Sequence, residues 1–184
     1  SRPPEQALAL RLNEAGQIDS LTLVPVPRPC PQPGQVIIEV EAIGLNYINL
    51  LSALGVYPGR VHGVGPLALE CSGRVAAVAP DVHHVAVGDP VMAVADNCAA
   101  THVCARADLV VRRPEGITAV QAAATPIAYL TALVAFERAG GLRPGMRILI
   151  HSAAGGVGWA ALQRARRAGA VVYATAGSEQ RRQA

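Results

Sequence analysis

Lysine is absent from this sequence, and all sixteen of its basic residues are arginine. That absence excludes any mechanism built on a Schiff-base lysine or a phosphate-loop lysine. Aromatic residues make up only 3% of the 184 residues, and the formal net charge is +3. A surface that stacks nucleic-acid bases needs more aromatic rings, and a backbone-binding stripe needs clustered positive charge. We therefore expect no nucleic-acid partner.

Long apolar runs and closely spaced cysteines are also lacking. The most apolar stretch, residues 117–136, is interrupted by Pro126 and polar residues, which leaves it short of the roughly 18 residues of a membrane span. We expect no signal peptide before the first strand. The cysteines do not have the dense spacing of a secreted disulfide scaffold; they are Cys30, Cys71, Cys98 and Cys104. We expect a cytoplasmic protein with reduced thiols and no membrane partner.

The first two thirds of the chain have the pattern of a β domain. Short strands are predicted at 7–12, 21–24 and 36–44, followed by a loop that enters a short helix within 45–55 and a loop at 57–66. Short apolar runs at 74–79, 90–95 and 108–111 alternate with turn dipeptides, which is typical of a small antiparallel β-barrel. We predict one domain over residues 1–116.

The pattern changes after Pro114. Residues 117–142 have helical spacing, with Thr118 as the expected N-cap and Gly140-Gly141 as the expected stop. Then a buried strand, a glycine turn with a helix, and a second strand are predicted at 147–153, 155–169 and 170–177. Together they form one βαβ unit, so the fold class is α/β, with 117–184 as the start of a nucleotide-binding domain. A doubly wound sheet needs about six strands, so we expect the chain to be part of a longer polypeptide.

The turn between the two strands carries the sequence Ala154-Gly155-Gly156-Val157-Gly158. A pyrophosphate needs exposed amides at a helix N-terminus and a close approach to the backbone, and glycine permits both because it has no Cβ. We predict that these five residues bind a dinucleotide. The alternative is a tight strand–helix turn without a ligand.

The end of the second strand distinguishes NAD from NADP. An NAD site places Asp or Glu there to bind the ribose 2′-hydroxyl. This sequence instead has Thr175 and Ser178, followed by Arg181 and Arg182. A hydroxyl and arginine side chains suit a 2′-phosphate, so NADPH is the expected cofactor. The alternative is that these arginines are ordinary solvated residues.

Three segments, residues 34–59, 67–94 and 139–182, resemble the medium-chain dehydrogenase/reductase superfamily. The second contains a Glu-x-x-Gly-x-Val…Gly-Asp-x-Val barrel signature, and the third is the βαβ unit. The chain is most similar to the enoyl reductase domains of modular polyketide synthases and animal fatty acid synthase, and to quinone oxidoreductases. The resemblance implies a GroES-like β-barrel catalytic domain followed by a partial Rossmann domain.

The resemblance also indicates the zinc-free branch of that superfamily. Asn46 and Leu69 stand where zinc-dependent members have two of their catalytic ligands. Cys98, His102 and Cys104 offer three ligands at an unusual spacing. We interpret them as loop and barrel residues, and expect no metal.

The same resemblance implies roles for individual residues. Tyr57 is the expected proton donor in reduction of an α,β-unsaturated thioester, unless its ring only lines the cleft. Asn46 and Thr131 match positions near the nicotinamide, where Asn46 can donate a hydrogen bond to the substrate carbonyl. Their alternatives are a turn-forming residue and a plain helix residue. The implied partners are an acyl carrier protein bearing the substrate on phosphopantetheine, and neighbouring synthase domains such as a ketoreductase.

Two departures from the enoyl reductase pattern leave alternatives open. Arg181 stands where the family often has a second acid, a lysine, and arginine does not release a proton near neutral pH. Ile48 and Asn49 replace a common Arg-Asp pair, and Ile48 is more typical of quinone oxidoreductases. A free-standing NADPH:quinone oxidoreductase is therefore the second hypothesis. A truncated, non-catalytic reductase-like structural module is the third.

Overall fold

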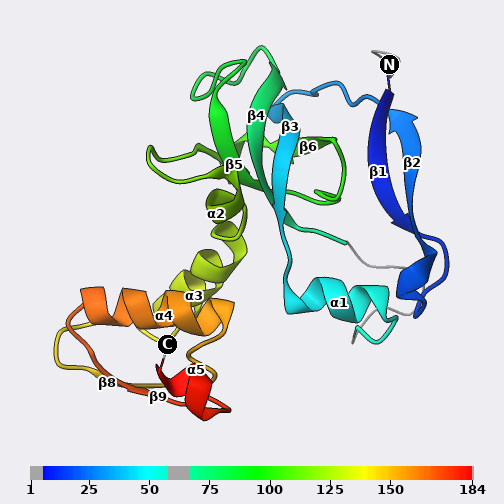
Figure 1. The fold of residues 1–184 in the computed structure, drawn as a ribbon. Coiled ribbons are helices and arrows are strands. Elements are labelled where there is room, and N and C mark those ends of the chain that lie inside the picture. The colour runs from blue at the N-terminus through cyan, green and yellow to red at the C-terminus, as the bar shows by residue number, and fades with distance from the viewer. Residues whose placement is uncertain (1–5, 58–66, 184) are drawn as a thin grey trace. The chain divides into compact units, whose positions relative to one another are not determined.

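The computed structural model describes residues 6–57 and 67–183, in two compact units, 1–126 and 127–184. The predicted loop at 57–66 lies outside the described residues except for Tyr57. Figure 1 shows the elements in chain order. They are β1 (Gln6–Leu12), η1 (Ile18–Ser20), β2 (Leu21–Pro27), β3 (Gln35–Gly44), α1 (Tyr47–Ala53), β4 (Glu70–Val78), β5 (Pro90–Val94), β6 (His102–Arg106), η2 (Ala107–Leu109), β7 (Val110–Arg112), α2 (Ala119–Ala123), α3 (Pro126–Arg138), β8 (Arg147–Ile150), α4 (Gly156–Arg167), β9 (Val171–Ala174) and α5 (Glu179–Gln183).

The first unit is built on a five-stranded antiparallel sheet with strand order β6-β3-β4-β5-β7. Strand β3 lies between β4 and β6, and its Val36, Ile37 and Ile38 are all buried. A continuous apolar run therefore occurs where both faces of a strand are covered. The β1–β2 hairpin is joined to the loop before β6 by the hydrogen bond from Leu10 N to Ala99 O, 2.7 Å. The predicted antiparallel β structure is confirmed, whereas strand β6 was not predicted.

Gly73 in β4 shows why the barrel signature requires a glycine. A Cβ at this residue would lie 2.0 Å from the carbonyl oxygen of Glu39 on the adjacent β3. The register between the two strands shifts nearby, between Val40 and Ala42. Such a bulge brings the backbones together, and no larger residue fits there.

The predicted helix over 117–142 is wrong in one respect, because it is two helices. Thr118 caps α2 as predicted and accepts a hydrogen bond from Gln121 N. Helix α2 then ends at Ala123, and α3 begins at Pro126, the first-turn position that proline tolerates. The buried Ala122 and Ala123 pack in the first unit, where α2 contacts β3 and β4. The two compact units consequently divide after Pro126 rather than after residue 116.

The stretch Ala119–Arg138 has the length and composition of a membrane-crossing helix, with a mean hydropathy of 1.6. The expectation that no stretch is long and apolar enough is therefore wrong by this measure. Core helices of other proteins meet the same criterion, which makes it weak evidence alone.

The second unit contains the predicted βαβ unit. Strands β8 and β9 pair in parallel with Arg147 opposite Val171 and Ile150 opposite Ala174. Small side chains from α3 and α4 form most of its core, including Ala132, Ala160 and Ala165. Because alanine has little bulk, α4 packs closely against β8 and β9. Helix α5 follows β9 after residues 175–178 and was not predicted as an element.

Candidate functional site

The glycine turn joins β8 to α4. Ser152 adopts a left-handed backbone conformation with φ of 53°, and Ala153 N donates to Thr175 O at 2.9 Å. A Cβ on Gly158 would lie 2.3 Å from Ser152 O, closer than any real contact. Gly158 therefore lets the first turn of α4 pack onto the preceding loop.

The same turn leaves the N-terminus of α4 open. Gly155 is the N-cap of this twelve-residue helix. Gly155 is exposed to solvent, as are Ala154 and Val157. A Cβ added to Gly156 would meet nothing within 4 Å. Exposed backbone amides, a helix dipole and space at Gly156 form a cradle that fits an anionic group such as a phosphate.

Two hydroxyl residues, Thr175 and Ser178, follow β9. Thr175 holds the glycine turn, since its Oγ1 accepts from Ser152 N at 3.3 Å and lies 3.2 Å from His151 Nδ1. Ser178 Oγ accepts from Arg181 N at 3.3 Å at the start of α5. The hydroxyls at this strand end thus organise the backbone.

The two arginines of α5 differ in their partners. Arg182 forms an ion pair with Glu179, with Nε 3.1 Å from Oε2. Arg181 has no ion-pair partner among the described residues. Of the two, Arg181 therefore has the cation available to an added anion.

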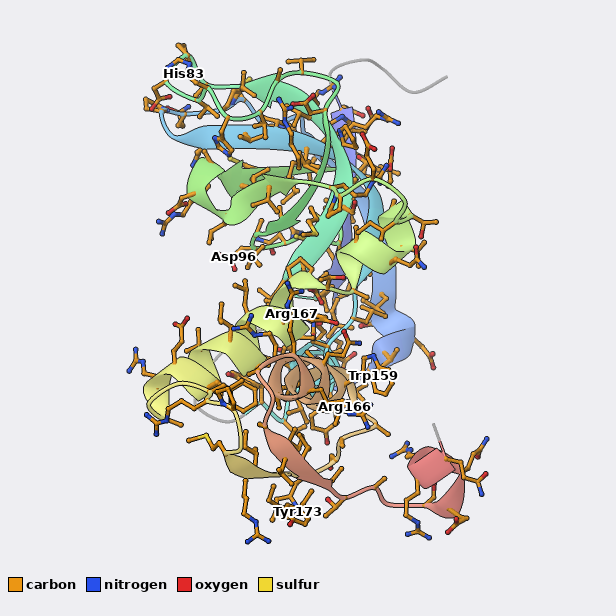
Figure 2. The ribbon with its side chains drawn as sticks, turned by 90° about the vertical axis from the view of Figure 1, so that its left-hand side faces the viewer. His83, Asp96, Trp159, Arg166, Arg167 and Tyr173 are labelled. Atoms are coloured by element: carbon orange, nitrogen blue, oxygen red, sulfur yellow. The ribbon has the colours of Figure 1, made fainter. Side chains whose placement is uncertain are left out.

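A cavity of about 480 Å³ lies between α4, β9 and α5 within the second unit. Trp159 and Arg166 from α4 line it together with Arg181. Figure 2 shows Trp159 and Arg166 on α4, with Tyr173 on the neighbouring strand β9. The lining combines an aromatic ring with cationic groups, which suits a planar, negatively charged ligand.

Charge is distributed unequally between the two units. Residues 127–184 contain eight arginines and two glutamates, whereas residues 1–126 contain eight arginines and eleven acidic residues. The overall net charge of +3 conceals a positive second unit. The positive field favours an anionic ligand in the unit that contains the glycine turn.

In the first unit, Asn46 forms the N-cap of α1. Its backbone N donates to Asn49 Oδ1 at 2.7 Å, and the two asparagines make a reciprocal capping box. Asn46 Nδ2 also donates to Glu70 Oε1 at 2.7 Å. Glu70 is only 2% exposed, whereas Asn46 is half-buried. Asn46 was predicted as a site residue, whereas the glutamate of the barrel signature, Glu70, was not, because a contact across 24 residues has no sequence pattern.

The remaining predicted site residues lie apart in the chain. Tyr57 is half-buried, and its hydroxyl has no hydrogen bond to any other described residue. Thr131 is exposed on α3 in the second unit. Tyr57 and Asn46 belong to the first unit. Their roles stay predictions.

Three cysteines of the first unit interact with neighbouring protein groups. Cys98 Sγ donates to Ala95 O at 3.1 Å, and Cys104 Sγ donates to Gln35 Oε1 at 3.0 Å. A hydrogen bond with Cys98 raises the pKa of the Cys71 thiol, and burial and the negative charge of Glu70 raise it further. Within the described ranges, no three His, Cys, Asp or Glu side chains converge in a way that could hold a metal ion.

Residues 32–166 match the family model described as the alcohol dehydrogenase GroES-like domain. The chain belongs to this family, and thereby to the medium-chain dehydrogenase/reductase superfamily. It is 43% identical over 177 residues to a component of the phenolphthiocerol/phthiocerol polyketide synthase of Mycobacterium tuberculosis. That match spans 96% of this chain and 8% of the synthase component.

Two solved structures have the same fold. The CurK enoyl reductase has a TM-score of 0.89 at 34% identity, over 97% of this chain and 56% of that one. The quinone oxidoreductase of Thermus thermophilus, solved also as a complex with NADPH, has a TM-score of 0.79 at 34% identity, over 95% and 55%. The chain therefore spans little more than half the length of these reductases. The predicted fold class is confirmed.

Proposed function

We propose that this chain is the substrate-binding part and the first βαβ unit of an NADPH-dependent enoyl reductase in a polyketide synthase. The reaction reduces the carbon–carbon double bond of an α,β-unsaturated thioester. The observation that carries the proposal is the open N-terminus of α4 behind a glycine turn, in a chain whose relative belongs to a polyketide synthase.

The backbone amides of Ala154, Gly156 and Val157 would hold the pyrophosphate of NADPH, because these residues are exposed. Gly155 would contribute by shaping the turn, since its own N–H donates to Ser152 O at 2.9 Å. Gly158 makes this possible, because it lets the helix start close behind the turn. Arg181 would bind the 2′-phosphate, with Thr175 and Ser178 supporting the backbone that presents it. Thr131 is proposed to lie at the nicotinamide end. When bound, NADPH supplies the hydride that adds to the β-carbon of the substrate.

The chain's own residues then act on the thioester. As a hydride adds at the β-carbon, the π electrons of the double bond move toward the thioester oxygen, which becomes negatively charged. An amide N–H of Asn46 stabilises that oxygen by a hydrogen bond. The phenol of Tyr57 gives its proton to the α-carbon, so that one hydride and one proton saturate the double bond.

The similarity to a polyketide synthase component supports the proposed substrate class. In such an assembly the enoyl group would be carried on the phosphopantetheine arm of an acyl carrier protein, and a ketoreductase would be a neighbouring domain. A reduction–dehydration sequence is the class of chemistry that must supply the double bond.

A quinone is the second candidate for the electron acceptor. Ile48 and the similarity to a quinone oxidoreductase at 34% identity favour it. The full-length protein that contains this chain should oxidise NADPH with crotonyl-pantetheine and much more slowly with a soluble benzoquinone. Rapid turnover of the quinone and none of the thioester would overturn the enoyl reductase proposal.

A further inference from the structure

Glu70 is a carboxylate enclosed in the core of the first unit. It begins β4 and is 2% exposed. Burial of a charged group is costly unless hydrogen bonds compensate it. Glu70 Oε1 accepts from Asn46 Nδ2 at 2.7 Å, and the backbone of Gly44 leaves room for the carboxylate. Glu70 is therefore hydrogen-bonded to Asn46, the N-cap of α1, and Asn46 is the residue that the proposed function places at the substrate carbonyl.

The contacts of Asn46 determine which edge of its amide remains available. The backbone N–H of Asn49 donates to the backbone carbonyl oxygen of Asn46 at 2.9 Å, and the capping box also brings this N–H to the Asn46 side chain. One of the two hydrogens on Nδ2 is donated to Glu70. A primary amide has two such hydrogens. No other residue of the described ranges takes the remaining N–H of the half-buried Asn46, which leaves this donor for a ligand.

We infer that Glu70 is a positioning residue that holds the Asn46 amide with an N–H, rather than its oxygen, available to the substrate carbonyl. The inference rests on the proposed function, because it deepens the role given to Asn46. A hydrogen bond to an ionised acceptor is stronger than a neutral one. It also keeps the donor oriented before the thioester oxygen gains charge, which is the condition for electrostatic catalysis.

Glu70→Gln removes this fixed orientation, because a glutamine can accept from or donate to the Asn46 amide. Loss of an oxyanion donor costs on the order of a hundredfold to a thousandfold in kcat. We expect Glu70→Gln to lower kcat by about tenfold to a hundredfold, since the amide still spends part of its time correctly oriented. The KM for NADPH should stay within twofold, roughly, because Glu70 lies in the other unit from the glycine turn.

The double variant Glu70→Gln/Asn46→Asp separates positioning from a structural role. It reverses the hydrogen bond, with the glutamine amide donating to the aspartate, so the packing and Tm should approach the wild-type values. Residue 46 would then offer only carboxylate oxygens to the substrate. We expect kcat to stay low although stability is restored. Recovery of kcat together with Tm would overturn the inference and make Glu70 structural.

The measurements are kcat, KM and Tm on the full-length protein with crotonyl-pantetheine and NADPH. Glu39→Gln is the matched control, because Glu39 is an exposed glutamate on the adjacent strand β3; it should leave kcat unchanged. Should Glu70→Gln fail to fold, the double variant carries the test. If the wild type reduces quinone alone, the enoyl reductase proposal fails. The kcat values of the Glu70 and Asn46 variants are then measured with quinone, which still tests the positioning role of Glu70. Wild-type protein that reduces neither acceptor would overturn both.

Discussion

Gly44 and Glu70 occupy complementary space: a Cβ at residue 44 would lie 2.3 Å from Glu70 Oε1. The same Cβ would lie 2.4 Å from the carbonyl oxygen of Ala123 on α2. The end of β3, the start of β4 and helix α2 thus meet at a point where only glycine fits. The buried position of the Glu70 carboxylate therefore requires that residue 44 has no side chain.

Gly44→Ala should destabilise the first unit, because the methyl group forces Glu70 or α2 to move. Overpacking of this kind costs about 1–3 kcal/mol. Urea unfolding should show a lower midpoint with an unchanged m-value. Gly177→Ala is the control, since a Cβ there meets nothing within 4 Å. Equal midpoints for Gly44→Ala and wild type would contradict the close contact.

The two glycines at the start of α4 should behave differently. Gly158→Ala would place a Cβ 2.3 Å from Ser152 O and should lower both stability and NADPH affinity. Gly156→Ala meets no protein atom and should leave Tm unchanged. Its methyl group would still obstruct a phosphate held by the turn. Fluorescence titration with NADPH, paired with thermal unfolding, measures both effects; unaltered NADPH affinity in Gly156→Ala would argue against a phosphate at this turn.

Arg181→Ala should reduce the preference for NADPH over NADH. Removing the guanidinium loses one charge-assisted contact to the 2′-phosphate, which corresponds to roughly 1.5–3 kcal/mol, or about tenfold to a hundredfold in KM for NADPH. The KM for NADH should change little. Arg182→Ala is the matched control, because that arginine is already paired with Glu179. A loss of preference in Arg182→Ala alone would reverse the assignment.

Tyr57→Phe should lower kcat by about tenfold or more, because general acid catalysis contributes on the order of a hundredfold and water can replace part of it. The hydroxyl has no hydrogen bond to another described residue, so Tm should not change. With an α-methyl enoyl thioester, the configuration at the α-carbon should also shift. Chiral analysis of the product measures this, and an unchanged rate and configuration would remove Tyr57 from the mechanism.

The buried thiol of Cys71 should make the protein sensitive to alkaline pH. Its pKa is raised by the hydrogen bond with Cys98, by burial and by Glu70. A raised pKa means that the folded state retains the proton that the unfolded state releases. The contribution of Cys71 to the free energy of unfolding is therefore fully present below pH 9, the ordinary pKa of a thiol. This contribution decreases as the pH rises further, because the unfolded state then releases the proton. Urea unfolding between pH 8 and 10 should show this loss, and Cys71→Ala should reduce it.

Local sequence patterns were sufficient for much of the fold. The β-branched run of β3, the cap at Thr118 and the glycine turn each act over a few neighbouring residues, so their elements were predictable. Strand β6 was missed because it has only five residues, with polar residues at both ends and no continuous apolar run. The break between α2 and α3 was missed because helical apolar spacing continues through Pro126, which is tolerated in a helix's first turn.

The sequence alone determined the chemistry that is available: amides exposed at a glycine turn, arginines without lysine, and no carboxylate at the end of β9. Only the tertiary structure decided which groups meet. It placed Glu70 against Asn46 and used Thr175 to hold the glycine turn at Ser152. Such contacts join residues far apart in the chain, and their existence depends on strand register and helix packing rather than on any local pattern.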